Sequence, residues 1–310
     1  MKFKYLSPFL NPLEWFRALR FKKENSRYDK SSYDLELYLY SKILTSKMLH
    51  YGYFEDPEAE PEDISMNMLE TAQKRYAEMI MEHIQDTGKP VLDVGCGLGS
   101  LADMIHNKGI QADVLTPNES QIKFINLNYP FLESHQCRFE EFVSSKKYGT
   151  VINSESLQYI KLAEAFKKTD EIIAPGGRWI IVDYFRRNES VPGKKLHLID
   201  DFRQMVRDYG WEIKHEQDIT PNILPTLRFV YMYVDRLLLP LKHYGYEKLR
   251  YKKPGLYYLS GRLREWIDRK VIKESSSINP QKFMNERTYR LFVLEKISDL
   301  PLTEASQQPA

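Results

Sequence analysis

Cysteine is scarce in this sequence. Its 310 residues include two cysteines, Cys96 and Cys137. Two cysteines are too few for a disulfide framework or a cysteine-based zinc site, and such scarcity is typical of a reducing compartment. We therefore expect a cytoplasmic protein without structural metal, and we predict no metal-binding residues.

Long apolar runs and a dominant sign of charge are also missing. No stretch of about 18 uncharged apolar residues is present, and the N-terminus lacks an apolar segment followed by a small-residue cleavage site. Hence we predict neither a membrane span nor a secretory signal. The 45 basic and 43 acidic residues leave a net charge of +2, which favours neither nucleic acid nor a strongly acidic partner.

Three of the 14 glycines lie close together, directly after a short apolar run. Residues Val91–Val94 have the pattern of a strand in a buried parallel sheet. Gly95, Gly97 and Gly99 then alternate with single residues, a spacing that indicates a tight turn in which a Cβ atom would obstruct the backbone. From Ser100 the pattern becomes helical. Ligands of open α/β sheets bind at such strand ends.

The spacing of this glycine loop differs from the dinucleotide fingerprint G-x-G-x-x-G. It reads D-x-G-x-G-x-G, and its acid would repel a pyrophosphate but suit an ammonium group. The loop resembles motif I of the class I S-adenosylmethionine-dependent methyltransferases, which implies S-adenosylmethionine as the cofactor. The residues that this resemblance places at the cofactor are Asp93, Gly95, Cys96, Gly97 and Gly99.

Upstream, a predicted helix over residues 33–54 leads into the string M-L-H-Y-G-Y-F. This string resembles the H-x-G-[FY] segment of gamma-tocopherol methyltransferases, whose relatives include the cyclopropane fatty acid synthases. The resemblance implies that Tyr51 and Tyr53 contact the methionine end of the cofactor, with His50 beside them. Ordinary aromatic packing at a helix end is the alternative.

Two further segments follow the second and third predicted strands. Thr116 and Gln121 match the T-x-S-x-x-Q of the cyclopropane synthase group, which implies hydrogen bonds to the cofactor; helix capping is the alternative. The third strand is predicted over 135–139. Glu140, directly after it, is the expected acceptor for the adenine amine, unless it is simply solvated.

The fourth strand, predicted over 148–153, is followed by S-E-S-L-Q-Y-I. This resembles the E-S-x-x-H of the tocopherol-type enzymes, with Tyr159 where they have histidine. The resemblance places Glu155 and Tyr159 around the acceptor and Asn153 at the cofactor. A methyl acceptor loses a proton on carbon, nitrogen or oxygen, and His50, Tyr159 and Glu155 are the candidate groups to assist.

The remaining pattern completes an α/β fold, a Rossmann-like doubly wound sheet of seven strands with N-terminal helices. The last strand is antiparallel, as the family resemblance implies. A Pro-Gly-Gly turn precedes the predicted fifth strand. A helix is predicted over 198–209, the sixth strand over 211–219 and the seventh over 289–295. The predicted division is an N-terminal helical cap segment (1–62), a core (63–219 and 287–298), an insertion (220–286) and a disordered tail (299–310).

The insertion between strands six and seven is far longer than an ordinary loop. It is aromatic and basic, so we predict a mostly helical substrate lid whose aromatics line the acceptor pocket. Its basic side chains would face outward, with peripheral contact to anionic lipid as one reading and a dimerisation element with solvated charges as the other. Residues 1–30 form a basic, aromatic helix, expected to pack onto the domain or to lie on a membrane.

The function predicted from these features is methyl transfer from S-adenosylmethionine to a largely apolar small molecule or lipid. The alternatives are methylene transfer to a lipid double bond, as in cyclopropane synthases, and an inactive cofactor-binding scaffold. Nucleic acid is not an expected partner, because N-S-E-S stands where base methyltransferases carry N-P-P-[YF] and no RNA-binding module is recognisable. The sequence leaves the oligomeric state open.

Overall fold

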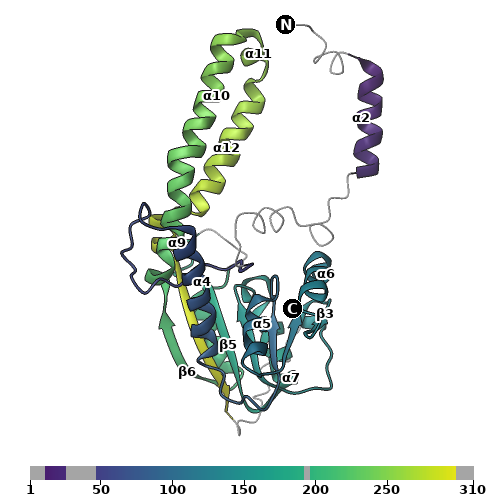
Figure 1. The fold of residues 1–310 in the computed structure, drawn as a ribbon, viewed down its shortest axis with the longest axis vertical. Helices are drawn as coiled ribbons and strands as arrows, with labels where there is room; N and C mark the ends of the chain where they lie inside the picture. Colours follow the sequence, from purple (N-terminus) through teal and green to yellow (C-terminus); the bar gives the residue numbers. More distant parts are fainter. Residues whose placement is uncertain (1–10, 26–46, 192–195, 298–310) are drawn as a thin grey trace.

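A seven-stranded mixed sheet organises the molecule (Figure 1). The computed structural model describes residues 11–25, 47–191 and 196–297. The strands are β1 (Val91–Val94), β2 (Ala112–Leu115), β3 (Glu133–His135), β4 (Tyr148–Ser154), β5 (Ile173–Arg186), β6 (Trp211–Asp218) and β7 (Arg287–Lys296), in the order β3-β2-β1-β4-β5-β7-β6. The first five pair in parallel, and β7 runs antiparallel to both β5 and β6. The predicted fold class is confirmed.

Helices cover both faces of the sheet because its strands are apolar on both sides. Val91 faces one core cluster and Leu92 the other, as the alternation of side chains along a strand requires. The helices of the core are α4 (Met66–Met81), α5 (Ser100–Asn107), α6 (Glu119–Asn128), α7 (Leu162–Ile172) and α8 (Ile199–Asp208). α4 and α5 pack on the first face, and α7 and α8 on the second. Ser65 caps α4, accepting a hydrogen bond from the Met68 N–H at 3.2 Å.

The third strand was predicted too late in the chain. β3 ends at His135, and Phe139–Glu141 form a 3-10 turn instead of a strand end. Phe139 is buried in the second core cluster, and turning the chain inward to bury it removes these residues from the sheet.

The N-terminal helix α2 (Pro12–Asn25) does not bury its apolar side chains. Trp15 and Phe16 are 63% and 72% exposed, so the expected packing onto the domain is not observed. Of the helix predicted over 33–54, residues 47–54 are described and are not helical, and the rest lies outside the described residues. The predicted tail at 299–310 also lies outside them.

The insertion between β6 and β7 is helical, as predicted. It comprises α9 (Thr220–Tyr233), a π-helical turn η4 (Val234–Leu238), α10 (Leu239–Lys252), α11 (Pro254–Leu259), α12 (Gly261–Ser277) and α13 (Pro280–Glu286). α10 and α12 lie side by side and project away from the sheet, with α11 at the far end (Figure 1). Lys242 of α10 donates to Asp268 of α12 at 2.6 Å. We call residues 239–277 the helical hairpin. No helix among the described residues is long and apolar enough to cross a bilayer.

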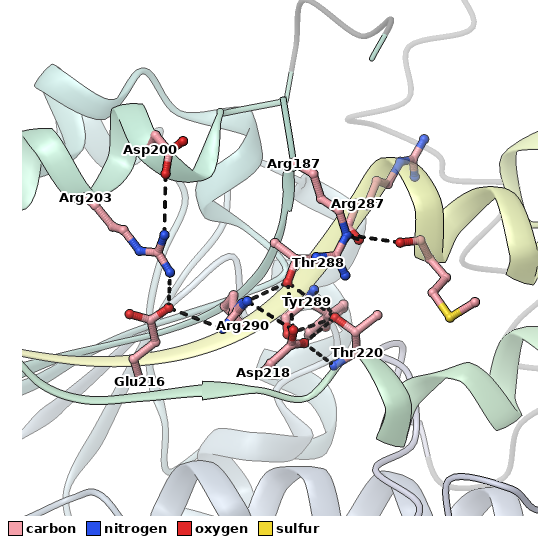
Figure 2. Close-up of polar contacts among 11 residues, drawn as sticks. Arg187, Asp200, Arg203, Glu216, Asp218, Thr220, Arg287, Thr288, Tyr289 and Arg290 are labelled. Atoms are coloured by element: carbon pink, nitrogen blue, oxygen red, sulfur yellow. Dashed lines mark hydrogen bonds and ion pairs between the residues drawn. The ribbon is translucent and has the colours of Figure 1, made fainter. Parts of the chain in front are cut away.

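A polar network fixes the two ends of the insertion to the sheet (Figure 2). The Tyr289 N–H donates to Thr220 Oγ1 at 2.7 Å, which joins the start of α9 to β7. Arg290 of β7 forms ion pairs with Asp218 at 3.0 Å and Glu216 at 3.3 Å, both on β6. The insertion therefore leaves and re-enters the sheet at one fixed point.

Candidate active site

The glycine loop joins β1 to α5 in a left-handed backbone conformation. Gly95, Gly97 and Gly99 have φ values of +75°, +56° and +82°, which L side chains rarely adopt. A Cβ atom on Gly95 would lie 2.4 Å from the Cβ of Ser156, and one on Gly97 would lie 3.4 Å from the side chain of Leu49. The positive φ at all three positions, and the clash with Ser156 at Gly95, therefore favour glycine in this loop.

Asp93, in β1, has a carboxylate without a complete set of partners. Its side chain is buried, and its Oδ2 atom has no hydrogen-bond partner. Burial raises the pKa of Asp93 to about 7 because the charged form loses its hydration. A buried acceptor of this kind needs a donor, and an ammonium group would supply both hydrogen bonds and compensating charge.

Two neighbouring cavities open above the glycine loop, with volumes of about 260 and 500 Å³. The smaller is lined by Asp93, residues 95–98 of the glycine loop and residues 47–50, and the larger by residues 115–118 and 138–140. Gly95, Gln121, Glu155 and Tyr159 line both. An elongated ligand with a cationic end and an aromatic end fits this pair of cavities.

The larger cavity contains the predicted polar residues. Thr116 donates to the Oε1 atom of Gln121 at 2.6 Å, so the two side chains are held together. Asn118 caps α6, accepting from the Ser120 and Gln121 N–H groups. The segment therefore caps a helix and lines the cavity at once. Glu140 also lines this cavity.

His50 lines the smaller cavity and stacks on Tyr76, with ring centroids 4.2 Å apart. Its Nδ1 atom lies 2.8 Å from the carbonyl oxygen of Tyr51. Because a carbonyl only accepts, this nitrogen carries the proton and donates. Burial lowers the pKa of His50 to about 4, so the ring is neutral at neutral pH and a weak base.

Glu155 lies where the two cavities meet, in a left-handed conformation with φ of 53°. Its Oε1 atom accepts from the Tyr51 N–H at 3.1 Å and from the Tyr289 hydroxyl at 2.6 Å. Tyr289 is in turn hydrogen-bonded to the hydroxyl of Tyr76 at 3.0 Å, and Tyr76 to Ser154 at 3.1 Å. Burial raises the pKa of Glu155 to about 7, so the carboxyl can hold or release a proton near neutral pH.

Sequence reasoning missed Tyr76 and Tyr289, which hold Glu155 in place. They lie on α4 and β7, 213 residues apart. The one signal available was the position of Tyr289 at the beginning of a predicted strand at the carboxyl edge of the sheet. Asp183 was also missed. Burial raises the pKa of Asp183 to about 8, and the nearby carboxylate of Glu155 adds to this effect.

Four residues predicted at the cofactor line neither of the two cavities. One is Gly99, where a Cβ atom would lie 3.2 Å from the side chain of Ile125 on α6. Asn153 is buried, donates to Ser156 Oγ at 2.9 Å and accepts from Trp179 Nε1 at 2.8 Å, so its polar atoms serve the sheet. Tyr53 lies at a separate cavity beside Arg75. Tyr51 packs edge-on against Tyr289, its backbone N–H donates to Glu155, and it is not among the residues that line the two cavities.

Two predicted residues line the cavity but are limited in what they can do. Tyr159 lines both cavities and is 82% exposed, so its hydroxyl is reached by water in this structure. The pKa of the Cys96 thiol lies well above its usual range because of burial and, second, the neighbouring Asp93. Cys96 is therefore a thiol that contributes backbone and shape to the glycine loop.

The insertion approaches the site through its ends, α9 and α13. The Gly52 N–H donates to Thr226 of α9 at 3.0 Å, and Phe283 of α13 packs against Tyr51. The residues that line the two cavities include none from 220–286. The expected aromatic lining by the lid is therefore not observed; instead, α9 and α13 hold residues 47–54 in place.

A separate acidic cluster lies on β2 and the edge strand β3, outside the two cavities. Asp113, Glu133 and His135 bring ligand atoms within 4.8 Å of one another. Lys146 donates to Asp113 at 2.9 Å and to Glu133 at 2.5 Å. An ammonium group thus already balances the two carboxylates, and we read the cluster as an ion pair that closes the sheet edge.

Comparison with known proteins supports this architecture. A family model described as a methyltransferase domain matches residues 68–217. Searching curated proteins by sequence gives no match. Among solved structures, a putative sarcosine dimethylglycine methyltransferase from Galdieria sulphuraria is similar with a TM-score of 0.63 and 14% identity, covering 88% of this chain and 100% of that chain.

Two other solved structures illustrate the range of chemistry on this fold. The geranyl diphosphate C-methyltransferase from Streptomyces coelicolor A3(2), with Mg²⁺, geranyl-S-thiolodiphosphate and S-adenosyl-L-homocysteine, has a TM-score of 0.58 and 17% identity over 88% of this chain and 95% of that chain. The [4+2]-cyclase SpnF has a TM-score of 0.59 and 16% identity over 83% and 92%. Residues 68–217 thus match a methyltransferase domain, the chain shares its fold with solved methyltransferase structures, and the residues around the glycine loop fit S-adenosylmethionine.

Proposed function

We propose that this protein transfers the methyl group of S-adenosylmethionine to a small, largely apolar molecule or lipid. The observation that carries the proposal is the unpaired, buried carboxylate of Asp93 beside a left-handed glycine loop. It suits the amino-acid end of the cofactor, and the larger cavity beyond it suits the nucleoside end. Thr116, Gln121 and Glu140 would supply hydrogen bonds there.

When bound, this cofactor supplies an electrophilic methyl group on a sulfonium, so the protein's own residues chiefly bind, orient and exclude water. Glu155 is the residue that we assign to the acceptor's proton. It lies at the meeting point of the cavities, and its pKa of about 7 suits a group that takes up a proton. Tyr289 and Tyr51 hold its carboxyl through Oε1.

His50 and Tyr159 have smaller proposed roles. His50 is too weak a base at a pKa of about 4 to take a proton readily, and its stacked ring shapes the wall of the smaller cavity. Tyr159, exposed between the cavities, is a candidate to cover the acceptor. The resemblance of residues 47–54 to the tocopherol and cyclopropane synthase group remains part of this proposal.

Calorimetry with S-adenosyl-L-homocysteine tests the cofactor half of the proposal. We expect binding by the wild-type chain and none by Gly97→Leu, because the added side chain would enter the smaller cavity. Circular dichroism checks that the variant is folded. Absence of wild-type binding at millimolar ligand, a free energy of about −4 kcal/mol or weaker, would overturn the proposal.

Transfer of a labelled methyl group tests the proposed reaction. Incubating the protein with methyl-labelled S-adenosylmethionine and a lipid extract should place label in the organic phase. Glu155→Gln keeps the size and an acceptor oxygen but loses the basic carboxylate, so turnover should fall by about 10²–10⁴ with cofactor affinity little changed. Cofactor binding without transfer to any fraction would favour another chemistry on this fold.

A further inference from the structure

We infer that the far end of the helical hairpin is a docking surface for an anionic lipid bilayer. This hairpin tip, residues 250–264, comprises the end of α10, all of α11 and the beginning of α12. It is the part of the insertion farthest from the sheet in Figure 1.

The tip exposes large apolar side chains that nothing in the described structure covers. From Val234 to Lys282 no residue is buried. Tyr258 and Leu259 are 83% and 80% exposed. The other exposed apolar side chains of the tip are Tyr251, Leu256 and Leu263. Exposed apolar clusters of this kind mark interaction sites, and leucines with tyrosines suit the boundary between headgroups and acyl chains.

The positive charge of the tip favours an anionic partner. Its 15 residues contain five basic residues and no acidic residue, whereas the whole chain has a net charge of only +2. The basic residues are Arg250, Lys252, Lys253, Arg262 and Arg264. Arg250 pairs with Glu247, and Arg264 stacks on Tyr257. The exposed Lys252, Lys253 and Arg262 can extend their charges to phosphate headgroups while leucines insert beside them. A second copy of the chain would present the same positive tip and be repelled, which disfavours a tip-to-tip dimer.

The geometry of the hairpin sets how the molecule would sit. β6 runs in the same direction as β5, because both are antiparallel to β7. The insertion therefore leaves from the carboxyl edge of the sheet, the edge that also carries the glycine loop. α12 has 17 residues, which at about 1.5 Å per residue gives a spacer of about 25 Å. A docked tip would turn the cavity-bearing edge toward the bilayer.

Vesicle sedimentation with the full chain tests this inference. We expect the protein to pellet with vesicles of 70% phosphatidylcholine and 30% phosphatidylglycerol at 50 mM salt. It should stay in solution with pure phosphatidylcholine, and pelleting should weaken at 500 mM salt because exposed charges are screened. Equal pelleting on both vesicles, or none on either, would overturn the inference. The readout needs no cofactor, so it fails or succeeds independently of methyl transfer.

Matched variants locate the surface. Each basic residue near an anionic membrane strengthens binding by about fivefold, so Lys252→Glu with Lys253→Glu should weaken vesicle binding by about 25-fold or more. The control pair, Lys108→Glu with Lys167→Glu, makes the same charge change at exposed positions of the sheet domain. It should weaken vesicle binding far less. An equal loss in both pairs would show a general charge effect and refute the assignment to the tip.

A third variant separates lipid from self-association. Leu256→Ser with Leu259→Ser should weaken vesicle binding by about tenfold and leave the molar mass by light scattering unchanged. A wild-type dimer that this variant dissociates, together with no vesicle binding, would assign the tip to a second copy and overturn the lipid inference. Both leucines are exposed, and circular dichroism checks that the hairpin remains helical.

Discussion

At the scale of single residues, the site combines groups that would each destabilise the folded state if they stood alone. Asp93 and Glu155 are buried acids with raised pKa values, and Glu155 also holds a backbone conformation that is unfavourable for a side chain. Such strain and desolvation persist where the surrounding structure enforces them, and they cluster at functional sites. Each of these groups gives a measurable signature.

Asp93 should release a proton when the cofactor binds. At pH 6 a carboxyl with a pKa of about 7 is mostly protonated, and a ligand ammonium beside it would ionise it. Calorimetry with S-adenosyl-L-homocysteine in two buffers of different ionisation enthalpy should therefore give different heats at pH 6 and similar heats at pH 8.5. Asp93→Asn should abolish the difference and weaken binding by about 10–100-fold. Identical heats at pH 6 would contradict the assignment.

Gly95 and Gly109 form a matched pair for the glycine loop. Both have positive φ, but a Cβ on Gly95 would meet Ser156 at 2.4 Å, whereas one on Gly109 has nothing within 4 Å. Gly109→Ala should cost about 1–2 kcal/mol of unfolding free energy through backbone strain alone. Gly95→Ala should cost about 3 kcal/mol or more, because the clash adds to that strain. Urea unfolding compares the two, and equal costs would mean that Ser156 moves aside freely.

At the scale of elements, the sequence predicted the sheet well and the site only in part. β1, β4, β6, β7 and α8 match their predicted ranges within about two residues, because each is recognisable from its own apolar pattern. β3 was misplaced because burial of Phe139, a tertiary effect, ends the strand.

The unpredicted part of the site depends on contacts between distant segments. Glu155, Tyr76 and Tyr289 meet only after α4, β4 and β7 have packed. Likewise, the M-L-H-Y-G-Y string predicted two tyrosine rings at the cofactor, but α9 and α13 draw Tyr51 and Tyr53 away from the cavities. No local pattern contains that information.

The helical hairpin should be removable. Leu238 and Ile278 line one cavity at its base, so a short Gly-Ser linker can replace residues 239–277. None of the deleted residues is buried, and α9 and α13 remain to hold residues 47–54. We expect S-adenosyl-L-homocysteine affinity within about twofold of wild type and loss of vesicle binding. A large loss of cofactor affinity in this variant would instead show that the hairpin closes over the site.

At the scale of the whole molecule, the buried acids make stability depend on pH. Burial raises the pKa values of Asp93 and Glu155 to about 7 and of Asp183 to about 8. A raised carboxyl pKa favours the folded state at low pH, and this stability is lost as pH rises through the folded-state pKa. The free energy of unfolding should therefore fall from about pH 4, the ordinary carboxyl pKa, to about pH 8. The part of this fall between about pH 6.5 and 8 lies above the titration of His50 in both the folded and unfolded states.

Urea unfolding at several pH values measures this slope. Asp183→Asn should flatten it, because the amide does not titrate. The exposed Asp200→Asn is the control, since its side chain is 83% exposed and should leave the slope unchanged. Stability that rises over this range would contradict the burial of these groups.

The position of β7 also determines when the fold can be completed. β7 is later in sequence than all its partners, yet it lies between β5 and β6 in the sheet. During synthesis, β5 and β6 must therefore wait with unpaired edges until the whole insertion has left the ribosome. Unpaired edges are templates for aggregation, and long loops slow the pairing that removes them. We conclude that the last strand completes the sheet, and that any chain lacking β7 leaves the facing edges of β5 and β6 unpaired and prone to aggregation.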